Sequence, residues 1–277
     1  MAFLVLDAGR WFGREELAEA LWPDHPPADP LKAVRHEIWC LKSALRAYGR
    51  GADEMLAANG HAVSLRHVPD LACDVHLFQD SLPANGSAAE ENRVAELETA
   101  IDLYAGDLMP GIDSRWCLWR RRALRDSYLC ALESLAEVHE KAGRWDPAIA
   151  ALNKLIAADP LVESAHRALM RCYHAKGDRA RALRQYELCR EALADAFDGS
   201  VEPMTDTWKL RAAIRGDATA IAVSVPWPSK RPGSVEAIRR PSQADNDGLL
   251  SDLTSLRDDL RSIGGRIDHL VALLSKT

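Results

Sequence analysis

Apolar residues recur every three or four positions between residues 31 and 48, and this spacing predicts a helix with two unlike faces. The apolar face consists of Leu31, Val34, Ile38, Leu41, Leu45 and Tyr48. The opposite face carries Lys32, Arg35, His36, Trp39, Ser43 and Arg46. Asp29 is the expected N-cap, and Pro30 suits the first helical position because its missing N–H would have no partner within the helix. One face can therefore enter a small core, while the other presents cationic and hydrogen-bonding groups.

The pattern on either side of this helix predicts the other parts of a winged helix-turn-helix over residues 1–70. The expected parts are the end of an incomplete first helix at residues 2–6, a second helix from residues 13–16 to Pro23, and two extended runs at residues 54–58 and 61–65. The apolar side of the second helix would consist of Leu17, Leu21 and Trp22. Asn59-Gly60 between the two extended runs indicates a β-hairpin. In this order of elements the later helix enters the major groove and the hairpin touches the flanking backbone.

A second pattern is an internal repeat with a spacing of 34 residues. The related pairs are Ala131 and Ala165, Leu135 and Leu169, Gly143 and Gly177, Ala148 and Ala182, and Leu152 and Tyr186. This spacing is typical of the tetratricopeptide unit, a pair of antiparallel helices. A helix over residues 90–104 precedes the repeats, and a linker is expected at residues 83–89. We therefore predict a helical solenoid over residues 71–213, which serves either as a binding groove or only as a scaffold.

The end of the chain shows a third pattern. Residues 214–248 have several prolines and no sustained periodicity, which predicts a flexible linker. A heptad repeat over residues 249–275 follows, and it predicts a coiled coil that joins copies of the chain. Its apolar positions are Leu249, Leu253, Leu256, Leu260, Ile263, Ile267, Leu270 and Leu274. The alternative is an amphipathic helix that docks on its own domain.

Composition and charge limit the possible functions. The chain has 277 residues and a net charge of -6, which argues against indiscriminate binding of nucleic acid by the whole surface. Residues 31–50 nevertheless hold five Lys or Arg residues against Glu37 alone. The six cysteines lack paired spacing and predict buried, reduced thiols in a cytoplasmic protein, without a disulfide framework or a zinc site. We expect no signal peptide and no membrane span.

No motif for nucleotide binding, metal-dependent hydrolysis or a serine nucleophile occurs in the sequence. We therefore predict neither an enzyme nor a bound cofactor or metal ion. One further cluster of charge consists of Arg115, Arg120, Arg121, Arg122 and Arg125. This cluster either extends a surface for DNA or an acidic partner or is a solvated helix face, with Trp116, Leu118 and Trp119 in the buried contacts. We favour the solvated face.

Several segments resemble a known family. REELAEALWPDHPP, DPLKAVRHEIWCLKSALR and DVHLFQDSL are similar to the winged helix region of bacterial transcriptional activators of the antibiotic-regulatory type. LYAGDLMPG, ADPLVESAHRALMR and ALRQYELCR resemble the helical bacterial transcriptional activator domain of the same proteins. The resemblance covers roughly residues 10–210. It implies a mainly α protein in which a response-regulator-like winged helix is joined to a tetratricopeptide-like domain.

These observations lead to the hypothesis of a DNA-binding transcriptional regulator, an activator by resemblance. We expect Arg35, Trp39 and Arg46 to contact base edges or sugars. We expect phosphate contacts from Lys32, His36, Lys42 and Arg66, with His61 on or beside the wing. The resemblance implies that the helical domain receives a signal or contacts RNA polymerase or a regulatory protein. The alternative is an adaptor protein built of helical repeats, whose truncated winged helix does not bind DNA.

Overall fold

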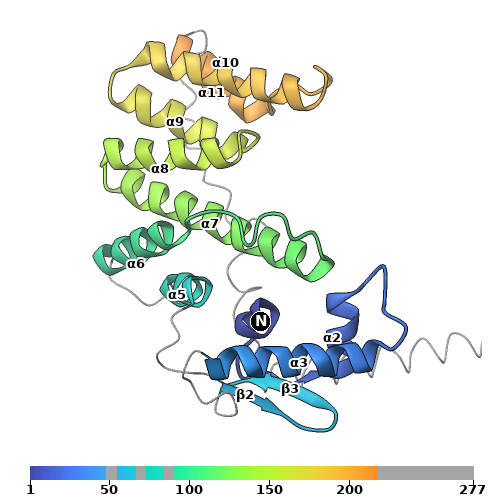
Figure 1. The fold of residues 1–277 in the computed structure, drawn as a ribbon. Helices are drawn as coiled ribbons and strands as arrows, with labels where there is room; N and C mark the ends of the chain where they lie inside the picture. Colours follow the sequence, from blue (N-terminus) through green and yellow to red (C-terminus); the bar gives the residue numbers. More distant parts are fainter. Residues whose placement is uncertain (48–54, 67–72, 84–89, 217–277) are drawn as a thin grey trace, which may run out of the picture. The chain divides into compact units, whose positions relative to one another are not determined.

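A computed structural model describes residues 1–47, 55–66, 73–83 and 90–216, all of which belong to one compact unit. The protein is mainly α-helical with one small sheet, as predicted (Figure 1). Its first elements are α1 (Ala2–Leu6), β1 (Phe12–Gly13), α2 (Arg14–Leu21), α3 (Pro30–Ala47), β2 (Leu56–Ala58) and β3 (Ala62–Leu65). This is the order of a winged helix-turn-helix, with β1 as a strand that the sequence pattern did not predict.

The three strands form an antiparallel sheet in the order β1-β3-β2. Phe12 of β1 pairs with Val63 of β3, which brings the segment before α2 onto the hairpin. The sheet and the first three helices share a small apolar core. Its buried members are Leu4, Phe12, Leu17, Ala18, Val34, Leu56, Val63 and Leu65. Leu21 was predicted to join this core but is 46% exposed, since it is the last residue of its helix.

The hairpin confirms the strand prediction but has a longer turn. Ala58 pairs with Val63 and β3 begins at Ala62, so the turn includes His61 as well as Asn59-Gly60. The backbone N–H of Asn59 donates to the carbonyl of Ala62 at 3.0 Å. The Asn59 side-chain oxygen accepts from the N–H groups of His61 and Ala62 at 2.9 and 2.7 Å. This side-chain bonding, a frequent role of asparagine in turns, places His61 in the turn instead of the strand.

The remaining described residues form a succession of helices, each packed against its neighbour in sequence (Figure 1). They are α5 (Asp74–Ser81), α6 (Glu90–Leu103), α7 (Arg115–Lys141), α8 (Trp145–Ala158), α9 (Glu163–Ala175), α10 (Arg179–Ala196) and α11 (Thr205–Arg215). The main core lies between α6, α7, α8 and α9. α11 packs on both α9 and α10 and extends the stack by one helix.

The residues of the 34-residue repeat occupy equivalent places in two helix pairs, α7–α8 and α9–α10. Gly143 and Gly177 have positive φ values of 68° and 79°, a backbone conformation that favours glycine. Ala148 and Ala182 are both fully buried, where a methyl side chain lets two helices approach closely. α8 stops at Ala158, directly before Asp159-Pro160, because the residue before a proline disfavours the helical conformation.

Several predictions fall on other parts of the chain. The 70/71 domain boundary, Tyr48 and nearly all of the linker at residues 83–89 lie outside the described residues. Nearly all of the linker at residues 214–248 and the whole heptad segment at residues 249–275 also lie outside them. Among the helices of the described ranges, none has the length and apolar character needed to cross a membrane.

Candidate nucleic-acid interface

The basic helix α3 begins as its sequence predicts. The Asp29 side chain accepts a hydrogen bond from the backbone N–H of Lys32 at 2.9 Å. The carbonyl of Asp29 accepts from the N–H of Ala33 at 3.0 Å. Asp29 is therefore the N-cap, and Pro30 is the first helical residue. These bonds fix the first turn of α3, which carries Lys32.

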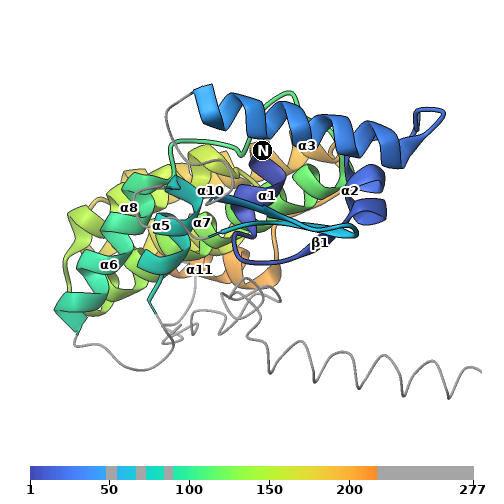
Figure 2. The ribbon, with the colours of Figure 1, turned by 60° about the horizontal axis from the view of Figure 1, so that its bottom comes forward.

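Fewer residues are covered on the inner face of α3 than its apolar pattern predicts. Val34 is buried, with 1% of its surface exposed, and Ile38, Leu41 and Leu45 are partly buried against the small core. Leu31 was predicted to lie on this face but is 40% exposed. It stands in the first turn, beyond the edge of a core made by two short helices and a small sheet. Figures 1 and 2 show α3 at the periphery of the unit, beside the β2–β3 hairpin.

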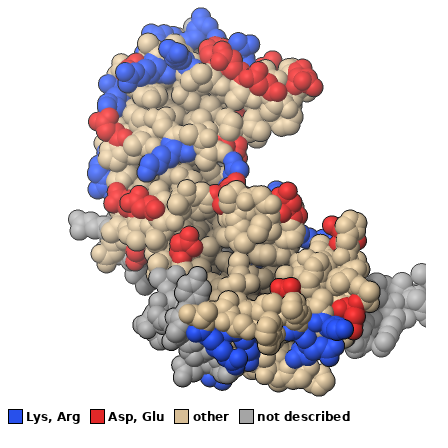
Figure 3. Space-filling view, in the orientation of Figure 1, with Lys and Arg blue, Asp and Glu red and all other residues tan. Residues whose placement is uncertain are grey.

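The outer face of α3 presents the predicted site residues together. Of these, Lys32, Arg35, His36, Trp39 and Arg46 are exposed, and Lys42 is half-buried. The His36 and Trp39 rings stack at 6.0 Å between centroids, with an interplanar angle of 22°. The Sγ of Cys40 lies 3.5 Å from Nε2 of His36. Figure 3 shows Lys and Arg side chains gathered over the part of the surface where α3 lies in Figure 1.

The two predicted wing residues do not lie together. His61 precedes β3 and Arg66 follows it, so a strand of this length separates them by roughly 17 Å. Both side chains are exposed. The turn at His61 is tied to the start of α2, because the backbone N–H of Arg14 donates to the His61 carbonyl at 3.0 Å and the Arg14 guanidinium donates to the Asn59 carbonyl at 2.7 Å.

The arginine cluster on α7 divides into two groups. Arg121 donates to the carbonyls of Leu108, Met109 and Ile112 at 2.7 to 2.8 Å. Arg120 pairs with Asp7, and Arg125 donates to the Ala158 carbonyl. These three arginines therefore form hydrogen bonds to other groups of the protein, which corrects the prediction of a wholly solvated face. Arg125 is nevertheless exposed, as are the other two, Arg115 and Arg122.

The predicted burial of the aromatic and aliphatic neighbours of this cluster is also corrected in part. Trp116 packs edge-on against Phe3 at 5.1 Å between ring centroids, as a buried contact requires. Leu118 and Trp119 are instead 45% and 62% exposed. The first turns of α7 extend beyond the core formed by α6, α8 and α9, so these two side chains have no helix to cover them.

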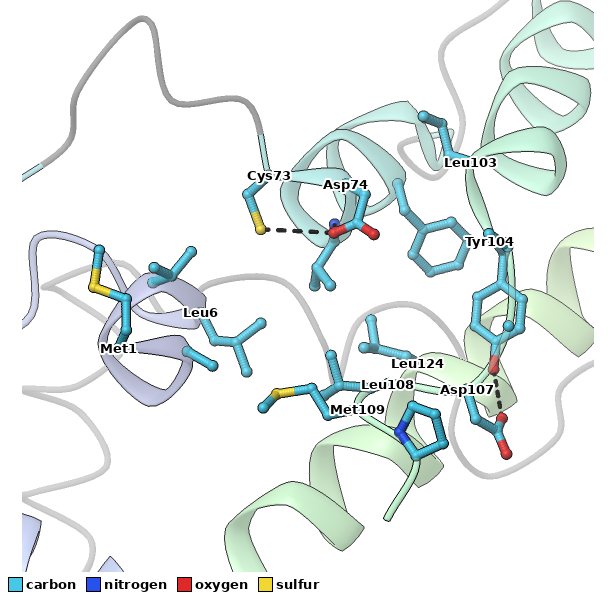
Figure 4. A pocket seen from close by; sticks show the side chains of 17 residues that line it. Met1, Leu6, Cys73, Asp74, Leu103, Tyr104, Asp107, Leu108, Met109 and Leu124 are labelled. Carbon is cyan, nitrogen blue, oxygen red and sulfur yellow. Dashed lines mark hydrogen bonds between the residues drawn. The ribbon is translucent and has the colours of Figure 1, made fainter. Parts of the chain in front are cut away.

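An apolar cavity of about 740 Å³ lies between α1 and the helical region (Figure 4). Residues 103–110, most of the LYAGDLMPG segment, form one wall, and Leu6 lies on the facing side. Arg121 holds this segment through its three carbonyl contacts, and Met109 takes a positive φ of 46°. The hydroxyl of Tyr104 donates to Asp107 at 3.0 Å, and burial raises the pKa of Tyr104 above its ordinary value. Internal hydrogen bonds thus hold this segment as an ordered loop along one wall of the apolar cavity.

The cysteines include three buried thiols, Cys117, Cys172 and Cys189. Burial raises the pKa of both Cys172 and Cys189 to about 12, so these two are protonated and unreactive at neutral pH. The other three cysteines are half-buried, which the sequence pattern did not predict. Within the described ranges, no group of His, Cys, Asp and Glu side chains is arranged to hold a metal ion.

The helical region matches a known family. The family described as "Bacterial transcriptional activator domain" matches residues 73–215, which are 143 of the 277 residues. The chain belongs to this family. The match begins at the residue before α5 and ends at the last residue of α11. The bacterial transcriptional activator domain is therefore the whole succession from α5 to α11.

Similar proteins extend the likeness to the winged helix region. Regulatory protein AfsR of Streptomyces coelicolor is 29% identical over 230 residues, which cover 80% of this chain and 22% of AfsR. Transcriptional regulator RedD of the same organism is 30% identical, covering 70% of this chain and 57% of RedD. Transcriptional regulatory protein MoaR1 of Mycobacterium tuberculosis is 25% identical, covering 73% and 66%. The chain thus spans less than two thirds of the length of each relative.

A solved structure has the same fold. Mycobacterium tuberculosis EmbR, in complex with a low affinity phosphopeptide, superposes with a TM-score of 0.64 and 25% sequence identity. The superposition covers 79% of this chain and 58% of the EmbR chain. It confirms the mainly α architecture of the described region.

The contacts between the activator domain and α1 were not predicted. Arg120 donates to both carboxylate oxygens of Asp7 at 2.5 Å, and the ring of His76 lies 3.2 Å from the Leu6 carbonyl. Asp7 and Arg120 are 113 positions apart, so no local spacing could have predicted this pair. The only sequence signal was the crowding of five arginines at the start of α7, which exceeds what one solvated face needs.

Proposed function

We propose that this protein is a DNA-binding transcriptional regulator that places α3 in the major groove. The observation that carries the proposal is the outer face of α3, an 18-residue helix with Val34 as its one buried residue among those described. Four of its residues are Lys or Arg and one is acidic, in a chain whose net charge is -6. A basic helix at the periphery, followed by a hairpin, suits the groove-and-backbone contacts of winged helix proteins.

The roles proposed for the individual residues follow from their exposure. Arg35 and Trp39 project from the exposed face and, with Arg46, are assigned to base edges or sugars. Phosphate contacts are assigned to Lys32, His36, Lys42 and Arg66, with His61 at the flanking turn. The names of AfsR, RedD and MoaR1, each called a regulatory protein or regulator, support the regulatory function and assign no role to a residue.

We further propose that residues 1–70 and 71–213 act as separate functional parts, the second of which binds a signal, RNA polymerase or a regulatory protein. The stacking of α7 to α11 supports this role because stacked helical repeats offer extended binding surfaces. The heptad segment from Leu249 to Leu274 would pair copies of the chain, so that two α3 helices read two half-sites. The function proposed is regulatory and requires no catalytic group.

Selection from a pool of random duplexes at two salt concentrations tests the proposal. The chain is compared with a Lys32→Ala, Arg35→Ala double variant and with an Arg93→Ala, Arg122→Ala control, whose arginines are exposed on α6 and α7. We expect a repeated half-site, lost in the α3 variant and kept in the control. Because Lys32 is the phosphate contact of this pair, the slope of log affinity against log salt falls by about 0.9 in the α3 variant.

Two outcomes would contradict the proposal. One is no binding to any duplex, and the other is sequence-blind binding that both double variants weaken equally. Either would favour the alternative function, an adaptor protein in which α3 is only a packing element. Thermal unfolding of the two variants serves as a control, because all four side chains are exposed and their loss should leave the fold intact.

A further inference from the structure

A second cleft, distinct from the outer face of α3, lies between the helix-turn-helix and the activator domain. Its volume is about 540 Å³, within the usual range for small-molecule sites. One side is formed by α1, α2 and the connection that leads from α2 to α3. The other side is formed by the first turns of α7. All of these elements belong to the same compact unit.

The α7 side of the cleft is aromatic. Trp116 is fixed by its edge-on contact with Phe3, and both line the cleft. Trp119 also lines it and remains 62% exposed, with the Arg120 guanidinium 5.5 Å from its ring centroid. A tryptophan this exposed buries little of its own apolar surface, so packing gives no reason for its presence. Exposed aromatic surface at a cleft typically marks a binding site.

Some of the charged residues that line the cleft form ion pairs and others do not. Arg120 pairs with Asp7 at 2.5 Å, and Arg10 pairs with Glu16 at 2.7 Å. Three charged lining residues, Glu19, Asp24 and Arg115, form no ion pair with any other residue in the part of the chain that the structure describes. Two carboxylates therefore face one guanidinium. This balance favours a cationic group on whatever occupies the cleft.

We propose that this cleft binds a small molecule that carries an aromatic ring and a protonated amine. The ring stacks against the exposed surface of Trp119, beside the half-buried Trp116. The amine lies on the acidic side, towards Glu19 and Asp24.

The position of the cleft gives its occupant a means of regulation. The ligand would touch the connection that sets the start of α3 and the first turns of the activator domain at once. A ligand that binds one arrangement of these two elements more tightly shifts DNA affinity by the same factor by which DNA shifts ligand affinity. The binding site itself does not depend on the proposed function, because ligand binding is measured without DNA.

The test measures binding of three probes to the whole chain by saturation-transfer NMR and calorimetry. The probes are phenethylamine, 3-phenylpropionate and propylamine, which carry ring and amine, ring and carboxylate, and amine alone. We expect phenethylamine to bind most tightly. The Trp119→Ala variant should weaken it about tenfold, the effect of about 1.4 kcal/mol. Trp208→Ala, which removes a tryptophan of similar exposure from α11, should leave binding unchanged.

A second pair of variants tests the acidic side. Glu19→Gln with Asp24→Asn should weaken phenethylamine up to about fivefold, as expected for exposed charge pairs, and should reduce its dependence on salt. Glu15→Gln with Glu98→Gln removes two exposed carboxylates elsewhere and should have no effect. Equal binding of phenethylamine and 3-phenylpropionate would overturn the assigned ligand class. No binding by about 10 mM probe, or equal loss in the Trp119 and Trp208 variants, would overturn the site.

Discussion

α3 and α9 are both amphipathic helices, but they use their residues in opposite ways. α3 has 18 residues, of which Val34 is buried, whereas α9 has 13 residues, of which eight are buried. α9 packs against α8, α10 and α11, so most of its surface meets another helix. α3 rests on one small core and leaves the rest of its surface to solvent.

The difference shows where stability and recognition are located. Substitutions in α9 should change the free energy of unfolding, because its side chains fill the space between helices. Substitutions on the outer face of α3 should change binding and leave the fold intact. Buried polar contacts also contribute to the packing of α9. In α9, Glu163 and Arg167 are both buried and bond to the Thr207 hydroxyl at 2.8 and 3.0 Å, which ties α9 to α11.

The largest expected effect is on the core of the helical stack. Leu169→Ala removes a fully buried side chain that packs among α7, α8 and α9. The lost apolar burial and the cavity left behind should lower the free energy of unfolding by about 2–5 kcal/mol. Urea unfolding followed by circular dichroism measures the change.

Leu188→Ala is the matched control, because Leu188 lies on α10 and is 42% exposed. Its effect should stay within about 0.5 kcal/mol. Equal losses in the two variants would contradict the division between a packed interior and a solvated surface.

A somewhat smaller effect tests the repeat. Ala182→Leu places three extra carbon atoms where Ala182 is fully buried in the apolar cluster of α9, α10 and α11. Overpacking should destabilise the protein by about 1–3 kcal/mol. Ala180→Leu, at an exposed position of α10, should be close to neutral in the same unfolding experiment. A neutral Ala182 variant would show that the small residue of the repeat is not required for close packing.

The next effect links stability to binding at α3. Asp29→Ala removes the side-chain bond to the Lys32 N–H and should cost about 1 kcal/mol of helix stability. Because the first turn carries Lys32, its fraying should also weaken DNA binding. Asp29→Asn keeps an accepting oxygen and should retain both properties. Loss of DNA binding in the Asn variant as well would point to the charge of Asp29, not its cap, as the cause.

The sequence predicted elements better than it predicted faces. The periodicity of α3 and the Asn-Gly hairpin depend on contacts between residues near each other along the chain, and the 34-residue repeat shows as a recurring spacing. The structure confirms all three. Leu31, Leu118 and Trp119 were assigned to buried faces and are exposed. Whether an apolar side chain is covered depends on how far the partner elements extend, and spacing along one helix does not contain that information.

The same limit applies to the proposed sites. The residues of the outer face of α3 lie on one helix, so their grouping could be predicted from the sequence. The cleft between α2 and α7 combines residues about 100 positions apart, such as Glu19 and Trp119. No local pattern brings these together. The crowding of tryptophan and arginine at the start of α7 was the available signal.

The smallest expected effect is confined to mildly acidic pH and belongs to the packed interior. Burial lowers the pKa of His166, although hydrogen bonds with Pro160 and Gln185 and the charge of Glu163 oppose the shift. Nε2 lies 3.0 Å from the Pro160 carbonyl and Nδ1 lies 2.8 Å from the Gln185 side-chain nitrogen, so a neutral ring satisfies both. The unfolded chain takes up the proton more readily. Stability should therefore be complete above the ordinary histidine pKa of about 6.5 and fall as the pH drops below it.

Urea unfolding at pH 7.5 and at pH 5.5 measures the difference in the free energy of unfolding. His166→Gln should reduce this difference, while His174→Gln, at an exposed position on the same helix, should not. If both variants keep the full pH dependence, it comes from other groups and His166 is protonated equally well in the folded and unfolded states.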